Sequence, residues 1–231
     1  MYNMEQTKVP VIFEDNHIIV VEKPVNIPVQ ADNTRDIDML TLIKQDIKER
    51  YNKPGEVYLG LVHRLDRPVG GVMVFARTSK AASRLSDQIR TRTFKKTYLA
   101  VVHGKPTKSE DTLVDWLLKD SRTNMVSVVP RLTPDAKEAI LDYKVLDSKE
   151  GFSLLEIQLH TGRPHQIRVQ LANMGHLLYG DQRYGLKVNK PGQQIALWAH
   201  KVAFLHPTQK DERTYFCKTP DWEPWGIFAR D

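Results

Sequence analysis

The 231-residue chain contains only one cysteine, Cys217. A single thiol excludes an intrachain disulfide and a four-cysteine zinc site. It also excludes the zinc-dependent base deaminases, whose signature requires a pair of cysteines. Because the chain has no disulfide to maintain, we expect a reducing, cytoplasmic location and a packed, inert Cys217.

Long apolar runs and nucleotide-binding glycine motifs are also missing. The longest early apolar run, Ile18-Ile19-Val20-Val21, is far shorter than the roughly 20 residues of a membrane-spanning helix. The start of the chain lacks the basic stretch and apolar core of a signal peptide. Neither a P-loop nor the glycine fingerprint of a dinucleotide site occurs. We therefore expect no membrane association and no nucleotide cofactor.

The composition is that of a globular protein with a surplus of positive charge. Hydrophobic residues make up 41% and charged residues 27%, which argues against disorder or a coiled coil across the chain. The 34 Lys and Arg residues against 28 Asp and Glu give a net charge of +6. A surplus of that size favours a polyanionic partner without proving one.

Short β-branched segments separated by polar turns dominate the chain. They predict strands at residues 9–13, 17–21, 57–62, 72–76, 98–102, 113–118, 125–129, 139–146, 152–159, 195–205 and 214–217. Apolar residues at helical spacing predict helices over 38–51 and 79–92, with Ser79 as the cap of the second. Pro164 and Gly175 predict the ends of a third helix. Without a Ser/Gly linker or an internal repeat, we expect one α+β domain over residues 1–231.

One candidate site follows an apolar strand. His63-Arg64-Leu65-Asp66-Arg67 is succeeded by a proline and, two residues later, by two glycines. In an extended segment Arg64 and Asp66 project to the same side. The flanking arginines would keep the carboxylate ionised even in a poorly hydrated cleft. A cleft carboxylate and a solvated ion pair on a surface loop both fit this pattern.

Two further segments combine basic residues with other functional groups. A helix that opens at Pro164 would place His165 and Arg168 on one face, with a helix start that could hold an anion. The alternative is a basic, capped helix on the surface. The segment 92–98 interleaves basic and aromatic residues, which suits a nucleic-acid strand but equally a helix end followed by a strand with a half-buried Tyr98.

Taken together and in order, these segments resemble the RluA-type family of RNA pseudouridine synthases over nearly the whole chain. The matching motifs are the Lys-Pro segment 20–29, His63-Arg64-Leu65-Asp66, Lys96-Thr97-Tyr98-Leu99-Ala100, Thr161-Gly162-Arg163-Pro164-His165-Gln166-Ile167-Arg168, and Gly180-Asp181 with Tyr184-Gly185. Three departures are visible, of which the least consequential is Leu177 in place of a usual Pro. Val69-Gly70-Gly71 stands where many members have Thr-Ser-Gly, and Asn26 stands where Gly is common, although Asn also tolerates a left-handed backbone.

The resemblance implies a fold, a reaction and a set of site residues. The fold is a mixed, largely antiparallel sheet in two similar subdomains with flanking helices and a central cleft. Asp66 is implied as the catalytic aspartate, Tyr98 as the residue that stacks on uracil, and Arg168 as the partner of the aspartate. The implied RNA contacts are Arg64, which would fill the gap left by the flipped nucleotide, with His63, Arg67, Arg92, Lys95, Lys96, Arg163 and His165.

The implied reaction is the isomerisation of uridine to pseudouridine in ribosomal or transfer RNA, without a metal or cofactor. We expect a monomer without an obligatory protein partner and without a separate RNA-binding domain in front of the catalytic one. Two other functions are compatible with the residues. One is a catalytically silent RNA-binding protein on the same fold, which the altered Val69-Gly70-Gly71 suggests. The other is a glycoside hydrolase, which would need a second carboxylate near Asp66.

Overall fold

The computed structural model describes residues 8–228, which divide into two compact units. The first unit comprises the chain up to Phe94 together with Ala199–Lys218. The second comprises Lys95–Trp198 and the chain from Thr219 onward. The chain therefore passes from the first unit to the second after Phe94, returns to the first at Ala199, and enters the second again at Thr219. Within the described residues, no helix is both long and apolar enough to cross a bilayer.

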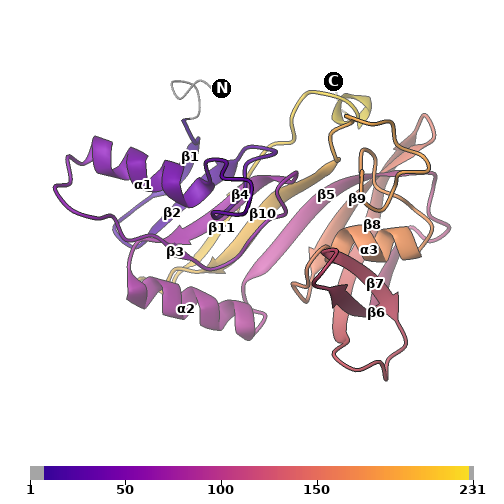
Figure 1. Cartoon of the computed structure of the whole chain (residues 1–231), viewed down its shortest axis with the longest axis horizontal. Helices are drawn as coiled ribbons and strands as arrows, with labels where there is room; N and C mark the ends of the chain where they lie inside the picture. The colour runs from indigo at the N-terminus through magenta and orange to yellow at the C-terminus, as the bar shows by residue number, and fades with distance from the viewer. Residues whose placement is uncertain (1–7, 229–231) are drawn as a thin grey trace. The chain divides into compact units, whose positions relative to one another are not determined.

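The first unit is built on antiparallel strands and two helices (Figure 1). Its strands are β1 (Val11–Glu14), β2 (Ile18–Lys23), β3 (Gly60–Leu61), β4 (Gly70–Ala76), β10 (Leu197–Leu205, which begins in the second unit) and β11 (Glu212–Phe216). The strand order is β1-β2-β4-β10, with β3 paired to β4 and β11 paired to β10. Every residue of β4 is buried, which matches its unbroken run of small and apolar residues.

Local sequence signals account for the two helices of this unit. Helix α1 (Met39–Arg50) is capped by Asp38, whose side chain accepts the backbone N–H of Thr41, and it buries Ile43 and Ile47. Helix α2 (Ser79–Arg90) is capped by Thr78 rather than by Ser79 as predicted. The extended backbone of Thr78 lets its hydroxyl accept the N–H of Ala81, whereas Ser79 already lies in the first turn.

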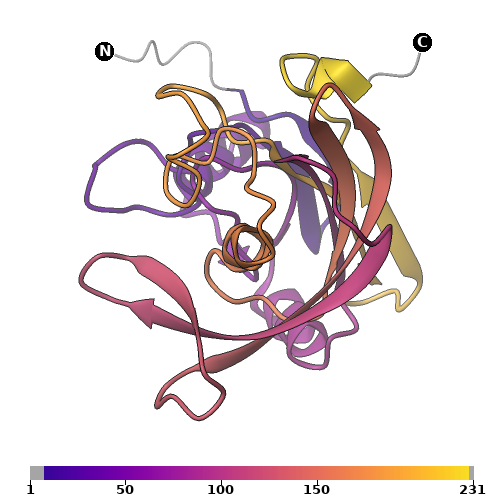
Figure 2. The ribbon, with the colours of Figure 1, turned by 90° about the vertical axis from the view of Figure 1, so that its right-hand side faces the viewer.

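The second unit is a curved antiparallel sheet that surrounds one short helix (Figure 2). Its strands are β5 (Lys95–His103), β6 (Glu110–Asp120), β7 (Met125–Val129), β8 (Lys137–Lys149) and β9 (Phe152–Leu159), in the order β5-β9-β8-β6-β7. In the first half of β8 the alternate residues Ala139, Leu141 and Tyr143 are buried, so one face of the sheet forms the core and the other is polar. The 3₁₀ helix η2 (Trp225–Phe228) closes the described chain.

Helix α3 (Gln166–Asn173) is held to this sheet by glutamine side chains as well as by apolar contact. Gln166 donates to the carbonyl of Ile140, and Gln170 donates to the carbonyl of Ala139 and to Asp115. Because these amides are buried, their pairing with strand carbonyls fixes how the helix is seated.

The start of α3 differs from the sequence prediction. The helix begins at Gln166, not Pro164, because His165 adopts a left-handed conformation with φ of 52°. Its predicted end at Gly175 is confirmed, since that glycine has φ of 87° just beyond the helix. The predicted strand 57–62 is reduced to β3, whereas β6 and β8 extend further than predicted.

Candidate active site

Asp66 lies on the loop between β3 and β4, in the first unit. Its carbonyl accepts the backbone N–H of Val69 at 2.9 Å, which closes a tight turn. The turn leads into Gly71, which has φ of 115°. A Cβ atom at Gly71 would lie 2.2 Å from the carbonyl oxygen of Ala199, so only glycine fits there. Gly71 thus serves the close approach of β10 to β4, and Asp66 stays on a defined turn.

Lys23, in the Lys-Pro segment, ties this loop to β2. The side chain is fully buried, and Nζ donates to the carbonyls of Pro24 at 3.0 Å, Arg67 at 3.0 Å and Val69 at 2.8 Å. Burial lowers the pKa of Lys23 to about 7, and the negative charge of Asp66 opposes that shift. Lys23 therefore fixes the backbone that directly follows Asp66 and supplies a positive charge close to it.

Arg67 is engaged by an acidic segment of its own unit. Its guanidinium forms ion pairs with Asp36 and, at 3.7 Å, with Asp32, and it donates to Thr34 at 3.0 Å. Its Nε also donates to the carbonyl of Asn26 at 3.1 Å. Asn26 has φ of 65°, so the left-handed backbone expected at this position is confirmed. The contacts of Arg67 connect the Asp66 loop to the segment after β2.

His63, Arg64 and Arg92 have different surroundings in the first unit. His63 is buried, its Nε2 accepts the backbone N–H of Val74 at 3.0 Å, and its ring lies 5.5 Å from that of Phe94. These contacts give His63 a structural role within the unit. Arg64 is exposed on the Asp66 loop, and Arg92 is exposed just after α2.

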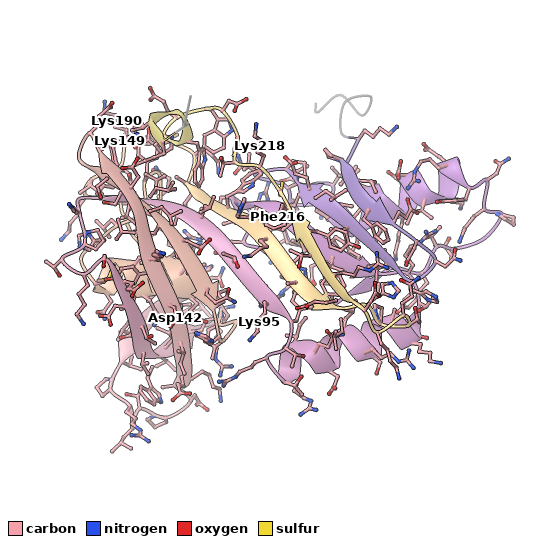
Figure 3. The ribbon with its side chains drawn as sticks, turned by 180° about the vertical axis from the view of Figure 1, so that it is seen from behind. Lys95, Asp142, Lys149, Lys190, Phe216 and Lys218 are labelled. Atoms are coloured by element: carbon pink, nitrogen blue, oxygen red, sulfur yellow. The ribbon has the colours of Figure 1, made fainter. Side chains whose placement is uncertain are left out.

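Tyr98 lies on the core face of the second unit's sheet. It is opposite Ile157 of β9, which is in turn opposite Tyr143 of β8, and all three side chains are buried. Lys96 projects from the same face of β5, and its burial lowers the pKa of its ammonium group. Lys95 belongs to the opposite, polar face of the sheet (Figure 3).

Arg168 is held by a buried carboxylate in the same unit. Its Nε donates to Asp181 Oδ2 at 2.9 Å, and its Nη2 donates to Asp181 Oδ1 at 2.8 Å. Burial raises the pKa of Asp181, but Arg168 and the backbone N–H groups of Arg183 and Tyr184 outweigh it and hold that pKa below its usual value. The pair is therefore ionised, and it is bidentate.

The remaining predicted residues flank the start of α3. Arg163 donates through Nε to the carbonyl of Glu138 at 2.8 Å. The Nδ1 atom of His165 lies 2.8 Å from the hydroxyl of Tyr184. Both side chains are half-buried.

The predicted site residues thus fall into two groups. His63, Arg64, Asp66, Arg67 and Arg92 belong to the first unit. Lys95, Lys96, Tyr98, Arg163, His165 and Arg168 belong to the second. Sequence reasoning assigned no role to three residues that organise these groups, namely Lys23, Asp181 and Tyr184. All three lie within motifs of the resemblance, so the motif boundaries were the available signal.

Comparison with known proteins agrees with the motifs. The family model for RNA pseudouridylate synthase matches residues 17–173. An uncharacterized RNA pseudouridine synthase of Bacillus subtilis, YhcT, is 35% identical over 88% of this chain and 66% of its own. Ribosomal large subunit pseudouridine synthase D of Nitrosomonas europaea is 33% identical over 90% of this chain and 62% of its own. The chain therefore spans less than two thirds of the length of these curated relatives.

Solved structures show the same fold. Human RNA pseudouridylate synthase domain containing 4 superposes with a TM-score of 0.77 at 24% identity, over 91% of this chain and 88% of the other. Human RNA pseudouridylate synthase domain containing 1 gives a TM-score of 0.74 at 20% identity, over 93% of this chain and 85% of the other. The α+β fold with its largely antiparallel sheet is thereby confirmed. Since the family model covers most of the chain, this protein belongs to the RNA pseudouridylate synthase family.

Proposed function

We propose that this protein isomerises uridine to pseudouridine in structured RNA, with Asp66 as the catalytic carboxylate. The observation that carries the proposal is the fixed Asp66 loop, which Lys23 of the Lys-Pro motif anchors through the carbonyls of Arg67 and Val69, within the residues that the family model matches. We also propose that the protein acts in the cytoplasm as a monomer whose partner is RNA. A relative named as a ribosomal large subunit pseudouridine synthase makes ribosomal RNA the first substrate to test.

The reaction needs no imported atoms and no change in oxidation state. The bond between uracil N1 and the ribose breaks, the base turns, and a new bond forms from C5 to the same sugar carbon, while the C5 proton leaves and N1 gains a proton. To expose this bond the uridine must leave its stack, which costs a few kcal/mol in a paired site. A flat aromatic side chain offsets part of that cost, and Tyr98 is assigned this role.

Asp66 acts in its ionised form, as a nucleophile or as a stabiliser of positive charge that develops on the sugar. In this proposal Arg168 supplies the cationic group of the reaction. The positive surplus of the chain binds phosphates, so the affinity for RNA falls as salt is raised.

The proposal is tested by the release of tritium from RNA that carries [5-³H]uridine. Ribosomal and transfer RNA transcripts are incubated with the protein, and binding is measured in parallel. The proposed function predicts release together with pseudouridine in the product. RNA binding without release from any transcript would favour the silent RNA-binding protein instead.

Substitution of Tyr98 separates stacking from proton transfer. Tyr98→Phe keeps the flat ring, so we expect it to retain most activity if Tyr98 only stacks on the base. Tyr98→Ala removes the ring and should lower kcat/KM by about 10- to 100-fold, in line with the roughly 1–3 kcal/mol of base stacking. Steady-state kinetics of tritium release measures both variants. An inactive but folded Tyr98→Phe would show that the hydroxyl itself reacts.

A further inference from the structure

The segment 180–185 lies in the connection between α3 and β10, and its backbone has little freedom. Gly180 has φ of 73°, and a Cβ there would lie 2.1 Å from the carbonyl oxygen of Gln194. A Cβ at Gly185 would lie 2.4 Å from Nδ2 of Asn189. The same Asn189 accepts the N–H of Gly180 at 2.8 Å and donates to Leu178 at 2.9 Å. The segment is therefore a packed turn, and side chains on it are presented in fixed directions.

Asp181 on this turn fixes the plane of the Arg168 guanidinium. Its two oxygens accept Nε and Nη2 of Arg168, and Oδ1 also accepts the backbone N–H groups of Arg183 at 2.8 Å and Tyr184 at 3.1 Å. Only 7% of the Arg168 side chain and 1% of the Asp181 side chain are exposed. Asp181 binds the edge of the guanidinium that carries Nε and Nη2. The third nitrogen, Nη1, takes no part in this bidentate contact. Arg168 is thereby held with a defined orientation.

Tyr184 contacts Arg168, His165 and β7 through one side chain. The Arg168 guanidinium carbon lies 5.3 Å from the centre of its ring. Its hydroxyl accepts the backbone N–H of Val126 in β7 at 3.0 Å and lies 2.8 Å from Nδ1 of His165. The ring packs on the apolar cluster formed by Leu117, Val126, Ala139 and Val169. Removing Tyr184 would therefore loosen Arg168, His165 and β7 together.

The hydrogen bonds of Tyr184 also favour one tautomer of His165. Burial raises the pKa of Tyr184, so the phenol keeps its proton. The Val126 N–H uses one lone pair of the hydroxyl oxygen, and a phenol proton donated to His165 Nδ1 satisfies all three groups. Neutral His165 then carries its proton on Nε2. The left-handed φ of 52° at His165 costs energy, and such a conformation persists where the surroundings hold it.

We propose that the turn 180–185 is a positioning device for the RNA-modifying site. In it, Asp181 orients Arg168, and Tyr184 orients both Arg168 and His165 while connecting them to β7. This inference rests on the proposed function, because it assigns Arg168 and His165 to the reaction. Asp181 and Tyr184 are positioning residues, since they act on the RNA only through these two side chains.

The test compares Tyr184→Phe and Asp181→Asn with matched substitutions in the same unit. Tyr184→Phe keeps the ring and removes only the hydroxyl, and Asp181→Asn keeps the shape and removes the charge. The controls are Tyr143→Phe, whose hydroxyl makes only a 3.5 Å contact with the Lys108 carbonyl, and Asp142→Asn, which lies on the polar face of the sheet (Figure 3). Tritium release gives kcat and KM, and ¹⁵N NMR reports the His165 ring and the Arg168 Nε–H.

We expect kcat to fall by about 10- to 100-fold in both variants, as for a small misplacement of reacting groups, while KM changes little and the controls match the wild type. In Tyr184→Phe the His165 ring signals should change from one tautomer to a mixture. In Asp181→Asn the slowly exchanging Arg168 Nε–H signal should be lost. Because NMR needs no turnover, both spectral readouts stand whether or not an active RNA is known.

Two results would overturn the inference. One is wild-type kcat in both variants under conditions where Asp66→Ala is inactive, which would leave the proposed function standing. The other is an unchanged His165 tautomer in Tyr184→Phe together with a retained Arg168 Nε–H in Asp181→Asn. Absence of tritium release from the wild type on every RNA would count against the proposed function instead, and the spectra would still decide the positioning role.

Discussion

Asp66→Ala should abolish pseudouridine formation while RNA binding persists. Removing one member of a catalytic unit that acts together costs on the order of 10⁴-fold or more in kcat. Asp66 is a strong candidate for such a member because its loop is fixed at the turn to Val69 and anchored by Lys23. Since phosphate contacts dominate RNA affinity, loss of one carboxylate should leave the dissociation constant within a few-fold of the wild type.

Asp66→Asn and Asp142→Asn complete this experiment. Asp66→Asn keeps the volume and tests the charge, so it should be as inactive as Asp66→Ala. On the polar face, Asp142 accepts a hydrogen bond from the Thr112 hydroxyl at 2.7 Å and lies 2.6 Å from Nε2 of His160, so its amide variant should retain activity. Single-turnover tritium release measures all three variants. Substantial turnover by either Asp66 variant would remove Asp66 from the chemistry.

Lys23→Met should have the second largest effect, on both stability and activity. The variant removes a fully buried ammonium group and leaves the carbonyls of Pro24, Arg67 and Val69 without their donor. Each unsatisfied buried acceptor costs about 1–3 kcal/mol, so a loss of at least roughly 2 kcal/mol in unfolding free energy is expected near pH 7. The Asp66 loop loses its anchor as well, so kcat should fall even in the folded fraction.

The pH dependence of this loss follows from the pKa of Lys23. The pKa is about 7 in the folded chain and 10.5 for an unperturbed lysine. Between these values the unfolded chain binds a proton that the folded chain has released, so the unfolding free energy of the wild type rises with pH. Methionine does not titrate. The stability gap between wild type and Lys23→Met should therefore widen from pH 7 toward pH 10, by up to about 1.4 kcal/mol per pH unit.

Urea unfolding at several pH values measures this gap. Lys218→Met, which removes an exposed lysine of the same unit (Figure 3), is the matched control and should show a small gap that does not depend on pH. A gap for Lys23→Met below about 1 kcal/mol, or one that narrows as pH rises, would contradict the anchoring role.

Local signals in the sequence predicted most elements of the fold. Asp38 was followed by apolar residues at helical spacing, and helix α1 begins immediately after it. The second helix cap was misplaced by one residue because Thr78 and Ser79 are both residue types that cap helices, and only the backbone conformation shows which of them does so. The start of α3 was misplaced because proline is typical of a first helical turn, and nothing local indicated that His165 would be left-handed.

The candidate site was predictable as a set of motifs but not as a set of contacts. Asp66, Tyr98 and Arg168 could be named because each lies in a motif of the resemblance. The contacts of Lys23 and of Asp181 could not, because they join residues 46 and 13 positions apart. A buried lysine looks the same in the sequence as a solvated one. Its three carbonyl partners become visible only when the strands are paired.

The central claim is that the Asp66 carboxylate makes pseudouridine at a definite uridine. Chemical mapping of pseudouridine in total RNA tests it most directly, in cells that carry the intact gene, the Asp66→Ala gene or no gene. The account predicts at least one site that is modified only with the intact gene, and that site identifies the substrate. A map that is the same in all three strains, or a site that persists with Asp66→Ala, would contradict it.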